Sequence, residues 1–203
     1  MTNDRAAARH FEAAAAGYGR NRAVGLLGVL RRQETRAVRA LAAVAPGDLV
    51  LDAGCGDGAT LDWLAATGCR AVGVDLAIGM ARTCRRRGHR VAVQDFARPG
   101  LRGGFDRVLC VGALEFAADP GGALAALADL LRPGGRLVLL YPHPLPLGLP
   151  YALYHRRHGV AIRLFSRARV GDLLRGAGLV GPVGHLRGWL SSACVAVRPV
   201  TPS

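Results

Sequence analysis

Short apolar runs alternate along the chain with amphipathic segments, and glycine or proline separates one from the next. A short apolar run between turn residues is typical of a buried strand, whereas apolar positions three and four apart indicate a helix. Strands are therefore expected at residues 49–51, 70–75, 90–94, 105–111 and 136–141, and helices at 59–67, 78–87, 121–131 and 167–176. This alternation predicts a parallel sheet covered by helices.

The two ends of the chain depart from the alternation. Residues from about 6 to 45 are predicted to be helical, with an apolar face opposite arginines, until Pro46 and Gly47 end the segment. A Pro-rich, aromatic stretch fills 143–158, and two last strands, at 179–185 and 191–198, are close enough to form an antiparallel hairpin. The fold class expected is α/β, a single-domain, doubly wound, mostly parallel seven-stranded sheet with an antiparallel C-terminal hairpin and helices on both faces.

A glycine-rich turn follows the first strand, with Gly54, Gly56 and Gly58 at alternate positions. Glycine lets a backbone turn sharply and approach a ligand closely, because no Cβ intervenes. Nicotinamide-binding domains place two residues between their second and third glycines, whereas here only Asp57 stands there. A carboxylate so close repels phosphate and suits a ligand that carries an ammonium group.

Carboxylates also end the next two strands. Asp75 closes the second strand, where it is suited to accept hydrogen bonds from both hydroxyls of a ribose, although a helix N-cap is the alternative. Asp95 closes the third strand beside Phe96, as an acceptor for an adenine amino group or as an ordinary loop carboxylate.

Together these strand ends resemble the class I S-adenosylmethionine-dependent methyltransferases, most of all the small-molecule enzymes of quinone biosynthesis. The resemblance covers about 18–142 and includes the glycine loop, Asp75 with Met80, Asp95 with Phe96, Leu114-Glu115-Phe116 and Arg132-Pro133-Gly134-Gly135. It implies a Rossmann-like fold, S-adenosylmethionine as cofactor, and a methyltransferase domain over 46–203 with a helical cap over 1–45 and a lid-like insert at about 143–160.

The resemblance also implies roles for individual residues. Gly54 and Gly56 would pack against the amino-acid part of the cofactor, Asp75 would bind the ribose, Leu76 and Met80 would flank the adenine, and Asp95 with Phe96 would read its edge. Tyr18 would lie over the cofactor, and Asp52, Cys55 and Val111 complete the expected cofactor-binding set.

The methyl acceptor is less well indicated. Cys110 to Ala113 lack the Asn/Asp-Pro-Pro-aromatic signature of enzymes that methylate exocyclic or amide nitrogens, and Phe116 stands where many small-molecule relatives have histidine. His143, after the fifth strand, is the candidate general base, and a turn residue is the alternative. Aromatic and arginine side chains in 145–160 suit a planar or carboxylated acceptor, or anchor a surface helix.

Net charge and cysteine content indicate less about the function than the motifs do. The net charge is +13, which suits a nucleic acid partner, but all 27 basic residues are arginine, and this favours a general bias in amino-acid usage. The five cysteines are scattered and no cluster has metal-ligand spacing, so no metal is expected. The start of the chain has no apolar signal core and no apolar run reaches bilayer length, which predicts a cytoplasmic protein without a transmembrane segment.

Three functions remain open at this point. Methyl transfer to a small-molecule acceptor is favoured, because no separate nucleic-acid-binding domain is indicated. An RNA or protein methyltransferase would use the basic surface, and a non-catalytic protein would keep only the nucleoside pocket. The oligomeric state is not indicated.

Overall fold

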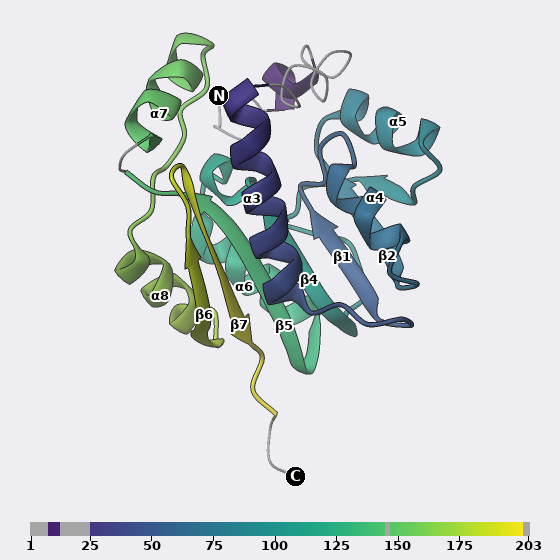
Figure 1. Cartoon of the computed structure of the whole chain (residues 1–203). Coiled ribbons are helices and arrows are strands. Elements are labelled where there is room, and N and C mark those ends of the chain that lie inside the picture. Colours follow the sequence, from purple (N-terminus) through teal and green to yellow (C-terminus); the bar gives the residue numbers. More distant parts are fainter. Residues whose placement is uncertain (1–7, 13–24, 145–146, 201–203) are drawn as a thin grey trace.

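The computed structural model describes residues 8–12, 25–144 and 147–200, and it shows one seven-stranded sheet between helices (Figure 1). The strand order is β3-β2-β1-β4-β5-β7-β6. The strands are β1 (Leu49–Ala53), β2 (Arg70–Asp75), β3 (Val91–Val93), β4 (Phe105–Val111), β5 (Leu131–Pro142), β6 (Val180–Arg187) and β7 (Ser191–Val197). The helices are α3 (Gly25–Ala42), α4 (Ala59–Ala65), α5 (Ile78–Arg86), α6 (Pro120–Leu130), α7 (Gly148–Arg157) and α8 (Arg167–Gly176), with a short η1 (Leu114–Phe116).

Pairing within the sheet confirms the expected fold class. Strands β3, β2, β1, β4 and β5 pair in parallel, whereas β7 pairs antiparallel with both β5 and β6. The strand order reverses between β1 and β4, and ligands of open α/β sheets bind beyond the carboxyl ends of the strands at such a point.

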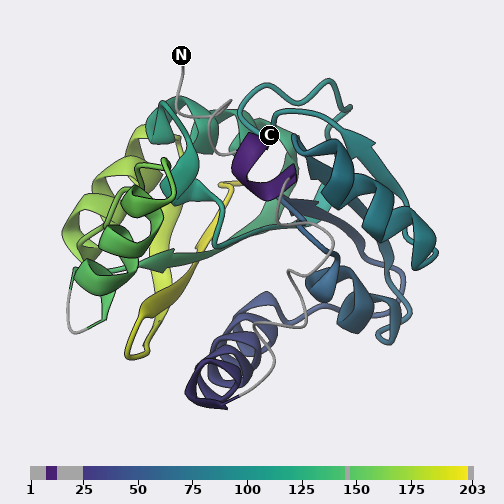
Figure 2. The ribbon, with the colours of Figure 1, turned by 90° about the horizontal axis from the view of Figure 1, so that it is seen from above.

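Helices cover both faces of the sheet. Residues of α3, α4 and α5 form one apolar cluster with one face, and residues of α6 and α8 form a larger cluster with the other. Figures 1 and 2 show α3 lying across the first face, with α6 and α8 on the opposite side. The central strands read as continuous apolar runs because both of their faces are buried.

Several expected boundaries were wrong. The N-terminal helical segment ends at Ala42, three residues early, because Ala43 adopts a left-handed φ of 44°. Strand β5 begins at Leu131, where the sequence predicted the last residue of a helix, and an irregular stretch precedes its regular pairing from Arg136. The Pro-rich stretch contains the helix α7, and residues 6–7 and 13–24 lie outside the described residues.

Polar side chains cap two of the helices. The Asp119 side chain accepts a hydrogen bond from the Gly121 amide at the start of α6, and Ser166 accepts one from the Arg169 amide in α8. Each cap supplies an acceptor for an amide that the first helical turn leaves unpaired.

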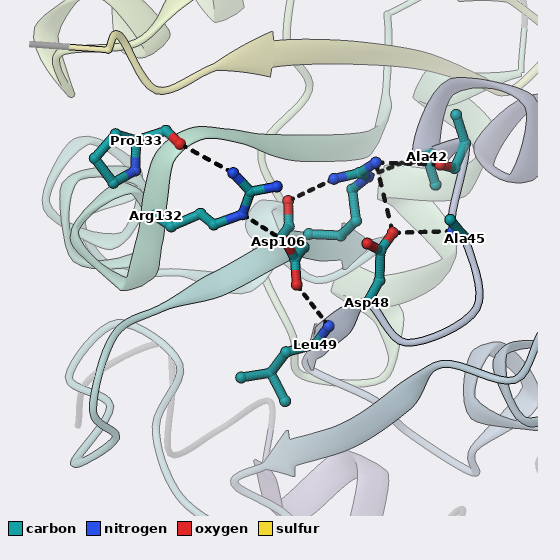
Figure 3. A network of polar contacts seen from close by, with 9 residues as sticks. Ala42, Ala45, Asp48, Leu49, Asp106, Arg132 and Pro133 are labelled. Carbon is teal, nitrogen blue, oxygen red and sulfur yellow. Dashed lines mark hydrogen bonds and ion pairs between the residues drawn. The ribbon is translucent and has the colours of Figure 1, made fainter.

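The amino-terminal edge of the sheet is joined by a polar network (Figure 3). One Asp106 oxygen accepts from the Leu49 amide at 2.7 Å, and the other contacts the Arg132 guanidinium at 2.5 Å. Arg107 donates to the carbonyls of Ala42 and Ala43, so the network ties β4 to the end of α3. These bonds, the Leu49 amide above all, lower the pKa of Asp106.

None of the helices in the described residues is both long and apolar enough to cross a membrane.

Candidate functional site

A cavity of about 430 Å³ opens at the carboxyl ends of β1, β2, β3 and β4. The loops after these strands contribute to its lining, together with residues of α3, α4, α5, η1 and α7. Nine residues of the expected cofactor-binding set line this cavity: Gly54, Cys55, Gly56, Asp75, Leu76, Met80, Asp95, Phe96 and Val111. The fold therefore brings together four strand ends that lie far apart in the sequence.

The glycine loop has a backbone that side chains would not permit. Gly54 has a φ of 76°, and a Cβ built on it would lie 2.5 Å from the Cβ of Ala113. Gly56 also has positive φ, at 54°. Because L-residues are strained in this region and Gly54 has no space for a methyl group, glycine lets the loop pass close to the strand ends. The loop is held there by its own amides, since those of Gly54 and Cys55 both donate to the Val74 carbonyl.

Asp75 connects the glycine loop to the second strand. One carboxylate oxygen accepts from the Gly56 amide and the other from the Ala77 amide, both at 2.8 Å. Burial raises the pKa of Asp75, and the hydrogen bonds from Ala77 and Gly56 oppose that shift. The carboxylate thus fixes the local backbone and lines the cavity. The helix N-cap considered from the sequence was wrong, because Ala77 is the N-cap of α5 and no side chain caps it.

The residues expected from the sequence to contact the adenine all line the cavity. Met80 is buried in α5, whereas Leu76 is partly exposed at the cavity rim. Asp95 accepts a hydrogen bond from the Ala97 amide at 2.9 Å, as a loop carboxylate does, and it lines the cavity beside Phe96.

Asp52 lies beneath the loop and does not line the cavity. Its side chain is 1% exposed, and neither carboxylate oxygen has a hydrogen-bond partner among the described residues. Burial, followed by the charges of Asp75 and Asp57, raises the pKa of Asp52 to about 8. The site thus keeps several carboxylates close together, which favours a cationic ligand.

The cavity lining also includes aromatic and basic side chains. Phe11, Phe116 and Tyr151 line it, with the Phe11 and Phe116 rings edge to face at 5.0 Å. Arg31 and Arg32 of α3 line the same cavity. Sequence reasoning missed both arginines, because the sequence contains 27 basic residues, all of them arginine, and helical spacing does not show which of them face a cavity.

The remaining candidates lie elsewhere. His143 is 6% exposed, its Nε2 is 2.9 Å from the Gly188 carbonyl oxygen, and it is not among the cavity-lining residues, so its catalytic role stays a prediction. Tyr18 lies outside the described residues. No group of metal-ligating side chains occurs within 8–12, 25–144 and 147–200.

One family model matches the part of the chain that holds the cavity's strand ends. Residues 51–139 match the family described as "Methyltransferase domain". This match covers 89 of the 203 residues. The resemblance to S-adenosylmethionine-dependent methyltransferases is thereby confirmed over the segment that holds the glycine loop and the four strand ends.

Curated proteins similar to part of this chain include two ubiquinone biosynthesis O-methyltransferases. The protein of Aromatoleum aromaticum is 38% identical over 100 residues, which is 45% of this chain and 42% of that protein. The protein of Methylococcus capsulatus is 36% identical over 114 residues, 52% of this chain and 46% of that protein. The match thus spans less than half the length of these relatives.

Solved methyltransferase structures share the whole fold. Magnesium protoporphyrin IX methyltransferase from Synechocystis, with bound S-adenosylhomocysteine, has a TM-score of 0.77 at 21% identity and covers 97% of this chain and 99% of that one. The 1,6-didemethyltoxoflavin-N1-methyltransferase of Burkholderia thailandensis has a TM-score of 0.73 at 23% identity, covering 98% and 91%. At these identities the likeness establishes the fold.

Proposed function

We propose that this protein transfers a methyl group from S-adenosylmethionine to a small-molecule acceptor. The observation that carries the proposal is the convergence of Gly54, Asp75 and Asp95 on one cavity at the switch in strand order, within a methyltransferase domain. Solved structures of the same fold are described with S-adenosylmethionine or S-adenosylhomocysteine bound.

The residues present fit this cofactor. Gly54 lines the cavity at a point where a Cβ would lie 2.5 Å from that of Ala113, so only a glycine backbone leaves room for the cofactor's close approach to the loop. The carboxylates of Asp75, Asp95 and Asp57 line the cavity and suit a ligand with an ammonium and a sulfonium charge. When bound, the cofactor supplies an activated methyl group on sulfur.

The protein's own contribution is then mainly positioning. Asp75 would accept hydrogen bonds from the ribose hydroxyls, and the glycine loop would fix the amino-acid end. Aligning a nucleophile in line with the methyl group accounts for about 7–11 kcal/mol of the barrier in well-oriented reactions. An amine or thiol acceptor needs no further group, whereas a hydroxyl needs a proton acceptor.

The aromatic residues of the cavity lining support a small planar acceptor. Phe11, Phe116 and Tyr151 offer ring faces and edges, which pack well against another ring, and Arg31 and Arg32 offer donors to an anionic substituent. One structure of similar fold, with a TM-score of 0.68 at 16% identity, is described as a [4+2]-cyclase, so the fold does not fix the reaction and methyl transfer itself needs a product assay.

Calorimetric titration with S-adenosylmethionine and S-adenosylhomocysteine tests the cofactor assignment. The wild type should bind both, and Asp75→Asn should weaken binding by at least about tenfold, because a neutral amide lacks the acceptor pair and the charge. Asp129→Asn, on the exposed surface of α6, is the matched control and should bind like the wild type. A folded wild type that binds neither compound would contradict the proposal.

Acceptors are then screened with the cofactor-loaded protein, using phenols, aromatic carboxylates and aliphatic alcohols. Mass spectrometry should detect a methylated planar product. Methylation of RNA or protein in place of every small molecule would contradict the small-molecule assignment.

A further inference from the structure

Two cysteine thiols meet beneath the glycine loop. The Sγ atoms of Cys55, in the loop after β1, and Cys84, on α5, are 3.9 Å apart, and both residues are buried. All five cysteines lie in described residues and are free thiols. Among the described residues, one pair of thiols is in contact, that of Cys55 and Cys84. A disulfide requires a separation of about 2.05 Å, so the sulfurs must approach by roughly 2 Å to form one.

Both sulfurs are packed against the cofactor loop and its neighbours. The Cys84 thiol donates to the Gly56 carbonyl at 3.1 Å, and the Gly56 amide in turn donates to Asp75. A Cβ at Gly73 of β2 would lie 2.8 Å from the Cys55 sulfur, so this sulfur is already against the sheet. Because protein interiors are closely packed and have low compressibility, bringing the sulfurs together must shift the loop or α5.

The geometry points to a modification site: we propose that a small-molecule disulfide oxidises Cys55 and Cys84 to an intramolecular disulfide, and that the cross-linked loop no longer holds the cofactor. The second half rests on the function proposed above. The cross-link removes the Cys84 thiol from the Gly56 carbonyl and pulls on the segment that Asp75 anchors. Cys55 itself lines the cavity.

The chemistry balances with the small disulfide as oxidant. The Cys55 thiolate attacks one sulfur of that compound, forms a mixed disulfide and releases one thiol. The Cys84 thiolate then attacks the Cys55 sulfur and releases the second thiol. The two cysteines lose two electrons, and their two protons end on the two released thiols.

Disulfide formation and cofactor binding must weaken each other by the same factor. If the disulfide lowers cofactor affinity by some factor, the bound cofactor lowers the equilibrium formation of the disulfide by the same factor. The hydrogen bond with Cys84, burial, and the charges of Asp52 and Asp75 raise the pKa of Cys55, so oxidation is slow at neutral pH.

The test incubates the full chain with oxidised glutathione at about pH 8.5, where thiolate is more abundant. Peptide mapping by mass spectrometry should show a Cys55–Cys84 cross-link, and calorimetry should show at least a tenfold loss of S-adenosylhomocysteine affinity that dithiothreitol restores. Saturating S-adenosylhomocysteine added first should suppress the cross-link.

Matched variants separate this disulfide from other oxidation. Cys84→Ser keeps a hydroxyl donor toward Gly56 but removes the partner sulfur. Oxidised glutathione therefore cannot form the cross-link in this variant, and no cross-link should lower its affinity for S-adenosylhomocysteine. Cys69→Ser should behave like the wild type, since Cys69 bonds to the Leu64 carbonyl away from the pair. An absent Cys55–Cys84 peptide, or a cross-linked protein with unchanged affinity, would overturn the proposal. Absence of binding before oxidation would instead refute the proposed cofactor function, and the peptide map would still report the thiol pair.

Discussion

Carboxylates at the two ends of the parallel strands have opposite environments. At the amino-terminal end, Asp106 accepts from a backbone amide and contacts the Arg132 guanidinium, and its pKa is lowered (Figure 3). At the carboxyl end, burial raises the pKa of both Asp52 and Asp75, and no arginine or histidine forms an ion pair with either one among the described residues.

This difference indicates that the carboxylates at one end serve stability and those at the other serve ligand binding. Paired carboxylates at the amino end stabilise the fold, since their charged forms gain hydrogen bonds on folding. Carboxylates that are buried together cost stability unless a cation joins them. The carboxylates at the carboxyl end therefore favour the binding of a cationic ligand, whereas those at the amino end stabilise the folded chain.

The largest expected effect comes from adding one methyl group to the glycine loop. Gly54→Ala places a Cβ 2.5 Å from that of Ala113 at a φ of 76°, so it should abolish S-adenosylhomocysteine binding and lower the free energy of unfolding by about 3 kcal/mol. Gly47→Ala at the amino end has a similar φ of 86° but open space, and should cost only about 1–2 kcal/mol. Urea denaturation and calorimetry measure both, and equal losses in the two variants would contradict the close-approach argument.

Replacing the buried Asp52 carboxyl group should give a gain in stability that grows with pH. The pKa of Asp52 is about 8 in the fold against an ordinary 3.8, so between these values the folded state holds a proton that the unfolded state has lost. Rising pH then lowers the wild-type free energy of unfolding by up to about 1.4 kcal/mol per pH unit. Asp52→Asn removes this dependence, so its stability relative to the wild type should increase by about 2 kcal/mol from pH 5 to pH 7 in urea titrations. A constant difference across that range would show that Asp52 is ionised in the fold.

The equivalent change at the amino end should have the opposite sign and a smaller size. Because the pKa of Asp106 is lowered in the fold, its contribution is present above its ordinary pKa and disappears as pH falls through the lowered value. Asp106→Asn should therefore be about 1 kcal/mol less stable than the wild type at pH 7, with the gap closing in acid.

The exposed Asp172–Arg175 pair supplies the control for this measurement. Its side chains are 58% and 65% exposed, so Asp172→Asn should change the free energy of unfolding by less than about 0.5 kcal/mol. A loss for Asp172→Asn that equals the loss for Asp106→Asn would show that the network in Figure 3 adds nothing beyond a surface ion pair.

Much of the fold could be read from local patterns. The apolar runs at β2 and β4 and the capped helix α8 were predicted to the residue, because strands buried on both faces and Ser-capped amphipathic helices leave strong local signals. The start of β5 was missed, since Leu131 continues the helical apolar pattern and only its pairing with Phe105 makes it a strand.

The sequence by itself determined the order of elements, the glycine loop and the carboxylates at successive strand ends, because each depends on neighbours within a few residues. Only the tertiary structure decided that Asp52 lies below the cavity, that His143 turns to the Gly188 carbonyl, and that Arg31 and Arg32 share a cavity with Phe116. The contact between Cys55 and Cys84 likewise depends on how α5 packs beneath the loop. These relations join residues that are distant along the chain, and they arise when the helices close on the sheet, so no local pattern encodes them.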